Sequence, residues 1–269
     1  MRKKEKQLNA RVDDIKRLKK DVFLLSFVSD YLAKQSSPGN FIHLKIDPTI
    51  LRRPFSIHKI KKNKVYILFR VRGRGTKMLS TLKKGCCLDI IGPLGKGFVI
   101  PESVNSRNRA INILIGGGLG VAPLVFLAEK LKKEKRKTDK NQDIILLGAK
   151  DEDDILCEEE FKRLKCKIFL STDNGSKGIR GNVINLLNDK LKSISYQQPV
   201  NIYTCGPKQM LREMFLIIKK YSQVHCQASF EQYMGCGLGF CCGCAIETKQ
   251  GYKKVCEDGP VFNLNTIWE

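Results

Sequence analysis

The sequence predicts a multidomain protein with an antiparallel β-barrel, an α/β domain built on a parallel sheet, and a small C-terminal module. Three observations predict this fold class. Short β-branched runs separated by Gly and Pro turns fill residues 9–100, strands alternate with helical segments from residue 111, and four cysteines with a distinctive spacing lie in the last 34 residues. We therefore expect domains at residues 1–104, 105–226 and 227–269.

The composition fits a soluble globular protein. With 269 residues, of which 42% are hydrophobic, the chain is long enough for two domains and a small module. No apolar run approaches the roughly 20 residues that span a membrane. The first seven residues carry no apolar signal segment, and 11 cysteines without such a segment suit a reducing compartment. We expect a cytoplasmic protein that does not associate with membranes.

The formal net charge is +22, from 49 Lys and Arg against 27 Asp and Glu. The excess is concentrated at residues 2–20 and 130–140, without interleaved aromatic residues or a known nucleic-acid-binding motif. A solvated lysine-rich surface explains it, and a basic face that meets an acidic protein partner is the functional alternative. We expect no nucleic-acid site.

The first domain reads as a small antiparallel barrel. Four runs of alternating or β-branched residues predict strands, and no long helical period intervenes. Pro38-Gly39, Asp47-Pro48 and Gly92-Pro93 mark turns between them. The expected strands are residues 22–28, 41–46, 64–71 and 87–91.

Two stretches of this barrel are candidates for holding a cofactor. In Arg53-Pro54-Phe55-Ser56 a proline with fixed φ stands beside a cation and a hydroxyl, which can present a flat hydrogen-bonding edge to a planar ring. In Arg70-Val71-Arg72, followed by Gly75 and Thr76, a strand ends in a glycine turn whose N–H groups and arginines can hold a pyrophosphate. A plain hairpin would also explain the second stretch. The order of the two stretches, followed by the glycine-rich residues 92–98, favours a cofactor site over a plain hairpin.

The second domain begins with a strand, a glycine turn and a helix. After a linker at 103–109, residues 111–115 read as a buried strand. Residues 116–123 contain four glycines, and an amphipathic segment follows over 124–133. This arrangement brings a dinucleotide pyrophosphate to the N–H groups of a helix N-terminus, with Gly117, Gly118 and Gly120 as candidates. The spacing is not a strict Gly-x-Gly-x-x-Gly.

Further alternation predicts a parallel sheet with helices on both faces. Cys205-Gly206-Pro207 stands where the last of these strands leads into a helix, and a ligand crevice is expected at such a position. A buried structural thiol and a direct role are both open for Cys205. The expected strands are 144–147, 167–170 and 200–204, and the expected helices are 158–165, 181–191 and 207–220.

The acidic run that follows the expected strand at 144–147 bears on the choice of nucleotide. Asp151 and its three acidic neighbours fall where the adenosine ribose of a dinucleotide is expected. Carboxylates there accept hydrogen bonds from ribose hydroxyls and repel a 2′-phosphate, which favours NAD over NADP. Lys150 argues the other way, and N-capping of a helix by Asp153 or Asp154 is an alternative role for the run.

The C-terminal cysteines have the spacing of a plant-type [2Fe-2S] site. Cys236, Cys241 and Cys244 form Cys-x4-Cys-x2-Cys, and Cys256 follows after 11 residues. The neighbouring glycines let the backbone curl around a cluster and direct N–H groups at its sulfurs. Cys242 is excluded because only Cys241 gives both gaps.

Zinc is the alternative metal for these thiols, but zinc ribbons favour two separate Cys-x2-Cys pairs over three ligands within nine residues. A disulfide framework is disfavoured by the absence of a signal segment. The remaining cysteines show no second ligand spacing and are expected to be mostly buried thiols.

These motifs resemble the ferredoxin-NADP reductase superfamily, whose barrel uses Arg-Pro-x-Ser/Thr for its flavin. The resemblance implies that Arg53, Pro54 and Ser56 flank the isoalloxazine and ribityl parts of FAD. It implies that residues 70–72 with Gly75 and Thr76 form the pyrophosphate segment, and that Cys205-Gly206-Pro207 lies beside the nicotinamide. The glycine run that ends in Ala122-Pro123 also matches the superfamily.

The order of the parts most closely resembles the family of dihydroorotate dehydrogenase B electron-transfer subunits, and the resemblance covers essentially the whole chain. The ending, four cysteines followed by Asp258-Gly259-Pro260-Val261-Phe262, is its most specific part. The departures are Asn40 in place of a usual Gln, Asn174 in place of a second acidic residue, and a short gap before Cys256. The short gap shortens a hairpin and leaves the ligand set intact.

The resemblance implies FAD, a [2Fe-2S] cluster and NAD as cofactors, and a partner. The partner is an FMN-containing dihydroorotate dehydrogenase catalytic subunit, in an assembly of two plus two chains. Electrons from dihydroorotate would pass from the partner's FMN through the cluster and FAD to NAD+, in pyrimidine biosynthesis. The sequence offers no pyrimidine-oxidising site of its own, and we assign no catalytic residue.

Two other functions fit parts of the sequence. A related reductase subunit can serve a different partner, as in sulfite reductase or a ferredoxin-dependent transhydrogenase, although the order Met234-Gly235-Cys236 favours the dihydroorotate type. An iron-sulfur regulator that binds DNA would show salt-dependent DNA affinity and no NADH oxidation.

Overall fold

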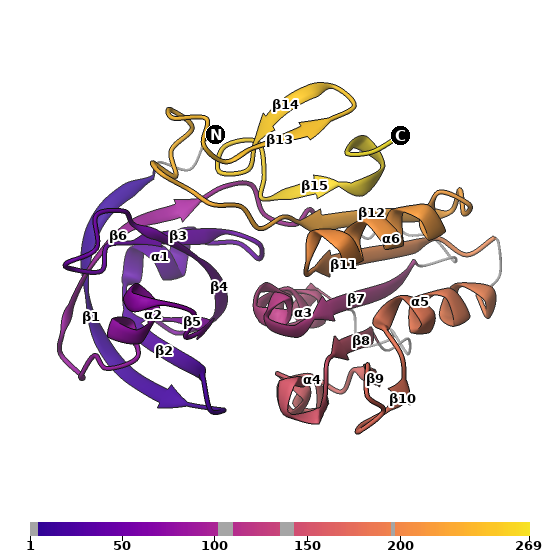
Figure 1. Ribbon diagram of the computed structural model, residues 1–269, viewed down its shortest axis with the longest axis horizontal. Coiled ribbons are helices and arrows are strands. Elements are labelled where there is room, and N and C mark those ends of the chain that lie inside the picture. The colour runs from indigo at the N-terminus through magenta and orange to yellow at the C-terminus, as the bar shows by residue number, and fades with distance from the viewer. Residues whose placement is uncertain (1–4, 102–109, 135–142, 195–196) are drawn as a thin grey trace.

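A computed structural model describes residues 5–101, 110–134, 143–194 and 197–269. It contains a barrel, an α/β domain, and a C-terminal segment that lies along the upper side of both in Figure 1. The predicted linker at 103–109 and the predicted boundary at 104 lie outside the described residues. No helix within the described ranges is long and apolar enough to cross a membrane.

The barrel is closed and antiparallel, as predicted, with strands in the order β1-β2-β5-β4-β3-β6. The four expected strands are present, and two more complete the barrel. β1 is rich in charged residues and β4 contains Pro54, so neither had the pattern of a strand in the sequence. The strands are β1 (Lys6–Arg17), β2 (Val22–Val28), β3 (Phe41–Leu44), β4 (Arg53–Lys61), β5 (Lys64–Arg70) and β6 (Cys87–Leu94), with short helices α1 (Asp30–Gln35) and α2 (Arg74–Leu79) between strands.

Strands β3 and β4 form a wall with two different faces. Ile42 pairs with Phe55, and both side chains lie in the barrel core. Side chains alternate along a strand and directly opposite residues share a face, so the neighbouring pairs face outward. These outward pairs are Phe41 with Ser56 and His43 with Pro54.

The α/β domain has a seven-stranded sheet in the order β10-β9-β8-β7-β11-β12-β15, in which only β15 is antiparallel to its neighbour. After β7 the chain moves outward to one side and then returns to place β11 on the other side. The boundary between β7 and β11 is therefore the topological switch point, where open α/β sheets bind ligands. The strands are β7 (Ile111–Gly117), β8 (Ile144–Ala149), β9 (Lys167–Thr172), β10 (Ile179–Arg180), β11 (Val200–Cys205), β12 (Val224–Ser229) and β15 (Val261–Asn263).

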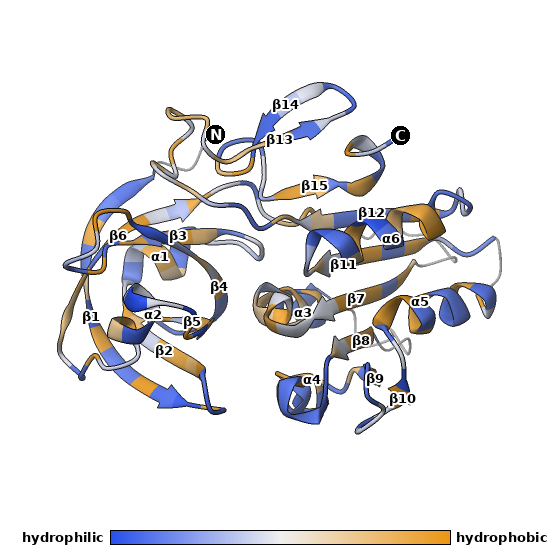
Figure 2. Cartoon of the chain, viewed as in Figure 1, coloured by the Kyte–Doolittle hydropathy of each residue, from blue (hydrophilic) through white to orange (hydrophobic). Residues whose placement is uncertain are grey.

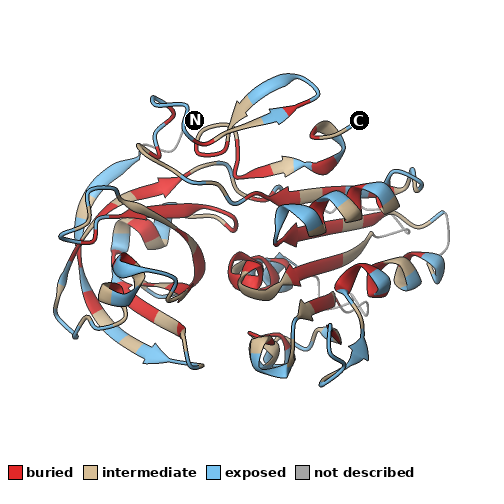
Figure 3. Ribbon diagram, viewed as in Figure 1, coloured by how far each residue is buried: buried red, intermediate tan, exposed pale blue. Residues whose placement is uncertain are grey.

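Helices cover both faces of this sheet, and the strands between them are buried (Figure 3). α5 and α6 pack on one face with part of the C-terminal module, and α3 and α4 pack on the other. The last of these helices, expected at 207–220, contributes buried Leu211, Met214, Phe215 and Ile218 to this core. Figure 2 shows the apolar sides of α5 and α6 turned toward the sheet. The helices are α3 (Ala122–Glu134), α4 (Glu158–Arg163), α5 (Val183–Lys192) and α6 (Lys208–Ile218).

The barrel contacts the α/β domain mainly through β4 and α3. His58, which is 1% exposed, places Nδ1 2.8 Å from the carbonyl oxygen of Ala122, the first residue of α3. Burial lowers the pKa of His58 to about 4, so the neutral ring donates this hydrogen bond. Lys59 and Glu160 add an ion pair at 3.5 Å across the same interface. The strand that carries Arg53 to Ser56 is thus fixed to the helix that follows the glycine turn.

The C-terminal module contains a two-stranded hairpin, β13 (Ala245–Thr248) and β14 (Gly251–Lys254), and then joins the large sheet through β15. The predicted boundary at residue 226 falls inside β12, so the end of the chain shares a sheet with the preceding domain. The polar hairpin projects away from both domains in Figure 2.

Tyr203 gives a test of the packing between barrel and sheet. Its ring lies edge-on to Phe98 at 5.8 Å, the residue is 0% exposed, and its hydroxyl has no hydrogen-bond partner among the described residues. Tyr203→Phe removes a buried unsatisfied group, so we expect the free energy of unfolding to stay equal or rise by about 1 kcal/mol. Tyr203→Ala leaves a cavity, and we expect a loss of roughly 3–5 kcal/mol. Equilibrium urea unfolding followed by circular dichroism measures both. A clearly destabilised phenylalanine variant would show that the hydroxyl has a partner.

Candidate functional site

The two cofactor stretches of the barrel lie side by side. A Cβ on Gly75 would stand 3.8 Å from Nε of Arg53, so the first turn of α2 packs against the start of β4. Pro54 and Ser56 face outward beside them, and both are only partly buried. A planar ring laid along this face would meet a proline, a hydroxyl and the neighbouring helix turn.

Two residues of these stretches are turned away from that face or otherwise engaged. The Phe55 side chain lies in the barrel core, 5.9 Å from the Phe69 ring at 68°, so only its main chain is available to a ligand. Arg70 contacts Asp154 at 2.7 Å and Asp21 at 3.4 Å, which joins the barrel to the α/β domain. Its guanidinium is already neutralised by carboxylates.

Thr76 caps α2. Its Oγ1 accepts hydrogen bonds from the N–H groups of Arg72 at 2.9 Å and Gly73 at 3.2 Å, and it donates to the Gly73 carbonyl. The simple hairpin considered for this stretch is wrong, because the strand leads into a helix. The first N–H groups of a helix have no partner within it, so the main chain of this turn is the part free to meet an anion.

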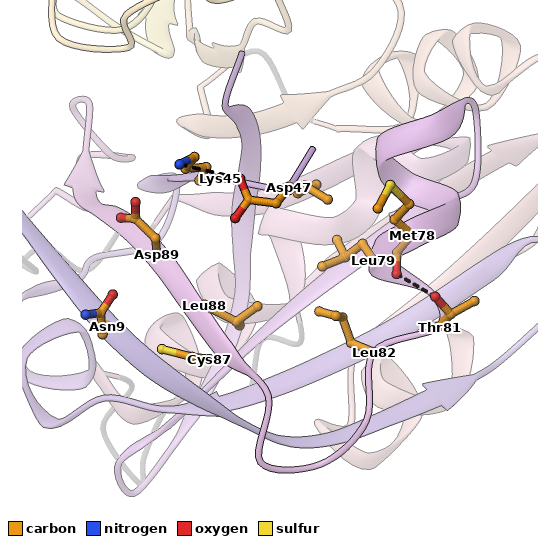
Figure 4. Close-up of a pocket in the computed structure, with 11 residues that line it drawn as sticks. Asn9, Lys45, Asp47, Met78, Leu79, Thr81, Leu82, Cys87, Leu88 and Asp89 are labelled. Atoms are coloured by element: carbon orange, nitrogen blue, oxygen red, sulfur yellow. Dashed lines mark hydrogen bonds and ion pairs between the residues drawn. The ribbon is translucent and has the colours of Figure 1, made fainter. Parts of the chain in front are cut away.

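A separate pocket of about 420 Å³ lies on the other side of α2 (Figure 4). Its floor is apolar, with Met78, Leu79, Leu82 and Leu88, and its rim carries Lys45, Asp47 and Asp89. None of the cofactor residues predicted from the sequence lines it. It borders the predicted pyrophosphate segment, residues 70–76, through Ile46, which a Cβ on Gly75 would contact at 3.8 Å.

The glycine turn and the Cys-Gly-Pro segment meet at the switch point. β7 and β11 are adjacent, with Gly116 opposite Cys205. A Cβ on Gly120 would lie 2.4 Å from the Cys205 carbonyl oxygen, and one on Gly117 would lie 2.7 Å from Sδ of Met210. Gly118, with φ +53, has open space around it and faces no such neighbour. Close approach of two backbones therefore explains Gly120, the nearby Met210 side chain explains Gly117, and a left-handed turn explains Gly118.

Cys205 is a buried neutral thiol. Burial raises its pKa, the Glu231 carboxylate raises it further, and only a contact with Ser229 acts the other way. It therefore has none of the thiolate character that a reactive cysteine needs.

Glu231 is a residue that the sequence reasoning missed. It follows β12 and is near both Cys205 of the switch point and Arg72 of the predicted pyrophosphate segment, because it interacts electrostatically with both. The residue is exposed overall, yet desolvation of its carboxyl raises the pKa, against the opposing effect of Arg72. A lone glutamate beside the cluster segment gave no signal in the sequence.

Asp151 caps the short turn η2 (Glu152–Asp154), where its carboxylate accepts from the Asp154 N–H at 3.0 Å. The capping role considered for Asp153 or Asp154 thus belongs to Asp151. Asp154 is held by Arg70, and Asp153 is 92% exposed beside Lys19 at 3.8 Å. Asp151 stands just after β8, which lies next to β7, on the edge of the sheet where the glycine turn begins.

The four predicted cysteine ligands form two pairs. Sγ of Cys244 lies 3.2 Å from Sγ of Cys256, while Cys236 and Cys241 each direct a backbone N–H at the other's sulfur at 3.5 Å. No group of three or more His, Cys, Asp or Glu within the described ranges is arranged around a single ion. A [2Fe-2S] cluster binds two protein ligands at each of two irons, whereas tetrahedral zinc needs all four around one centre. Two pairs fit the two-iron cluster.

The backbone N–H groups of the loop stabilise the thiolate form of Cys236. Burial raises the pKa of Cys236, but hydrogen bonds from the N–H groups of Leu238 and Cys241 outweigh it and lower the pKa to about 7. Burial and then Cys244 raise the pKa of Cys256 to about 12, as expected of two thiols that share a site. Cys242 is exposed with φ +55 and makes no such contact with another described thiol.

The cluster loop is fixed to the barrel by His43 and to the hairpin by Lys254. Nδ1 of His43 lies 3.2 Å from the carbonyl oxygen of Cys236, and Nζ of Lys254 donates to the carbonyl of Gly239 at 2.8 Å. Burial lowers the pKa of His43, against the opposing effect of its bond to Cys236. The sequence reasoning missed His43, because one histidine on a strand is not distinguishable from a core residue before the pairing is known.

The glycine-rich residues 92–98 connect the barrel to the C-terminal module. The Asn40 side-chain amide donates to the Gly95 carbonyl at 2.7 Å, and the Lys96 N–H donates to the Gly259 carbonyl at 2.5 Å. A Cβ on Gly95 would lie 2.5 Å from Cδ of Pro260. The glycine-rich residues 92–98 and the Asp-Gly-Pro-Val-Phe ending at 258–262 thus pack against each other.

The comparisons with known proteins agree with this arrangement. A sequence model described as the iron-sulfur cluster binding domain of dihydroorotate dehydrogenase B matches residues 231–267, and one described as an oxidoreductase NAD-binding domain matches 114–214. A solved structure of an NADH-dependent reduced ferredoxin-NADP oxidoreductase superposes with a TM-score of 0.81 at 25% identity, over 96% of this chain and 89% of that chain.

Two relatives are similar over nearly their whole length, and both are named "Dihydroorotate dehydrogenase B (NAD(+)), electron transfer subunit". The protein of Caldanaerobacter subterraneus subsp. tengcongensis is 36% identical over 95% of this chain and 96% of its own. That of Lysinibacillus sphaericus is 35% identical over 97% of this chain and 98% of its own. The chain therefore belongs to the family of dihydroorotate dehydrogenase B electron-transfer subunits.

Proposed function

We propose that this chain carries electrons between an FMN-containing dihydroorotate dehydrogenase catalytic subunit and NAD+, in the cytoplasm and in an assembly of two plus two chains. The names of its relatives and the matched cluster and NAD domains support the proposal. The observation that carries it is the position of the β3–β4 wall. Its outer face presents Pro54 and Ser56 of the predicted flavin residues, contacts the cluster loop through His43, and reaches α3 of the nucleotide domain through His58.

Each cofactor has a distinct set of residues. We assign FAD to the face formed by Arg53, Pro54, the main chain of Phe55 and Ser56. Its pyrophosphate belongs at the main chain of residues 70–72 and at the turn of Gly75 and Thr76, because the Arg70 side chain is held by two aspartates. The cluster belongs to Cys236 with Cys241 and Cys244 with Cys256.

The nucleotide belongs at the switch point. Gly118 leaves open space for its pyrophosphate, and Gly117 and Gly120 let the turn pack closely on Met210 and Cys205. Gly206 and Pro207 form the floor on which the nicotinamide lies, with Cys205 as a neutral structural thiol. Asp151 faces the adenosine ribose. When bound, FAD exchanges a hydride with nicotinamide and single electrons with the cluster. The protein holds the three groups against one wall and leaves dihydroorotate chemistry to the partner.

The central test is turnover of the complete assembly. The purified chain is combined with its FMN-containing partner, dihydroorotate and NAD+, and NADH absorbance is followed. We expect NADH to form only when both proteins are present. Absence of turnover, with FAD and two irons bound per chain, would reject dihydroorotate as the electron source and leave the reductase architecture standing.

Cys256→Ser tests the ligand set, and Cys242→Ser is its matched control. We expect Cys256→Ser to lose the cluster, because it breaks the pair with Cys244, while NADH still reduces FAD. The exposed Cys242 is not part of either pair, so its variant should keep full iron and acid-labile sulfide content. A normal cluster spectrum in Cys256→Ser would show that another thiol is the fourth ligand.

Asp151→Asn tests the preference for NAD. Asparagine caps a helical turn as well as aspartate does, so η2 should persist while the charge facing a 2′-phosphate is removed. We expect the ratio of kcat/KM for NADPH over NADH, measured with ferricyanide, to rise about 10-fold, which is about 1.4 kcal/mol. Asp153→Asn removes a charge from the same turn and should leave the ratio unchanged. Equal ratios in both variants would exclude Asp151 as the ribose partner.

A further inference from the structure

His43 is a completely buried histidine whose role is not explained by the barrel core. It is 0% exposed, yet its strand neighbours Ile42 and Leu44 fill the barrel interior and His43 points the other way. On that outer face it pairs with Pro54 of the proposed flavin face. A buried imidazole in this position needs partners for two nitrogens.

The first nitrogen has a partner in the cluster loop. A carbonyl oxygen can only accept, so Nδ1 of His43 carries a hydrogen and donates it to the Cys236 carbonyl at 3.2 Å. Nε2 of the neutral ring is then an acceptor. It is buried and has no hydrogen-bond partner among the described residues.

The contact fixes the first cluster cysteine in space. Gly237 has φ +71, and a Cβ on it would lie 2.5 Å from Nδ1 of His43, so the loop is pressed against the ring. The next turn directs the N–H groups of Leu238 and Cys241 at Sγ of Cys236, at 3.4 and 3.5 Å. Such N–H···S bonds tune the potential of an iron-sulfur cluster. A shift of the Cys236 carbonyl would change the geometry of both N–H···S hydrogen bonds.

We propose that His43 is a positioning residue for electron exchange: it holds Cys236 against the flavin-bearing wall through Nδ1 and so sets the geometry and the potential of the cluster. The inference rests on the proposed function, in that it takes Pro54 to face FAD and Cys236 to bind iron. Among the described residues, His43 is the one side chain that both shares a face with Pro54 and Ser56 and hydrogen-bonds to the cluster loop.

Three substitutions separate the two nitrogens. The amide nitrogen of His43→Asn stands near the place of Nδ1, that of His43→Gln near the place of Nε2, and His43→Leu keeps bulk without a hydrogen bond. His58→Leu is the matched control, since it removes another buried barrel histidine that donates to a main-chain carbonyl far from the cluster loop.

The readouts are the electron paramagnetic resonance spectrum and midpoint potential of the cluster, and the stopped-flow rates of FAD and cluster reduction by NADH in the isolated chain. We expect His43→Leu and His43→Gln to shift the spectrum and potential and to slow cluster reduction about 10-fold or more, with FAD reduction kept. His43→Asn should restore the rate to within about 3-fold, and His58→Leu should leave the cluster spectrum unchanged.

An unchanged spectrum and rate in His43→Leu would overturn the proposal. Failure of His43→Asn to rescue would overturn it as well, because ring packing alone would then account for the residue. If His43→Leu does not fold, Gly237→Ala tests the same contact by displacing the loop from an intact His43, and wild-type behaviour of that variant would overturn the proposal. These measurements need neither dihydroorotate nor the partner, so they remain decisive if the central turnover test fails.

Discussion

The structure depends on one short segment, residues 258–263, which is bonded on both sides. On one side the Gly259 carbonyl accepts from the Lys96 N–H of the barrel loop, and on the other Val261 begins the strand that pairs with β12. Buried main-chain groups must find partners, and here the partners come from two different domains. The segment also packs against Gly39, where a Cβ would lie 2.9 Å from Val261. The barrel, the sheet and the cluster module are therefore joined at this segment, in addition to the contacts of His58 with α3 and of Arg70 with Asp154.

This segment places the C-terminal cysteine loop beside the barrel, although the loop belongs to no large domain of its own. The cluster loop lies over the outer side of β3, whose inner side is barrel core, and β4 continues from the flavin residues to the nucleotide helix. Two of the contacts between the parts are hydrogen bonds from a buried histidine to a main-chain carbonyl, from His43 to the cluster loop and from His58 to α3. Ion pairs of Lys59 with Glu160 and of Arg70 with Asp154 add to them. Electron transfer depends on fixed separation, and main-chain contacts fix position more firmly than long flexible side chains do.

Several side chains that seemed suited to ligands in the sequence serve the scaffold instead. Arg70 joins two domains through Asp21 and Asp154, Thr76 caps α2, and the Phe55 ring fills the barrel. The two barrel stretches pack together at Gly75 and Arg53, and their part in binding a cofactor stays a prediction. Residue types alone do not show whether the side chain or the main chain of a residue is free to meet a ligand, because that depends on which face of the strand or helix the side chain occupies. Glu231 is the opposite case: it belongs to no sequence motif, yet the fold brings it close to both Cys205 and Arg72.

The sequence alone determined the fold class and the parallel sheet with its glycine turn, and it predicted the four cysteine ligands, because these depend on local periodicity, turn chemistry and spacing along the chain. It did not reveal β1 or β4, since charge and proline obscured their alternation, nor that the end of the chain joins the large sheet. Only the tertiary structure decided that the cysteines form two pairs and that His43 meets the first of them. Those facts rest on contacts between residues up to 193 positions apart, and no local pattern encodes a contact at that separation.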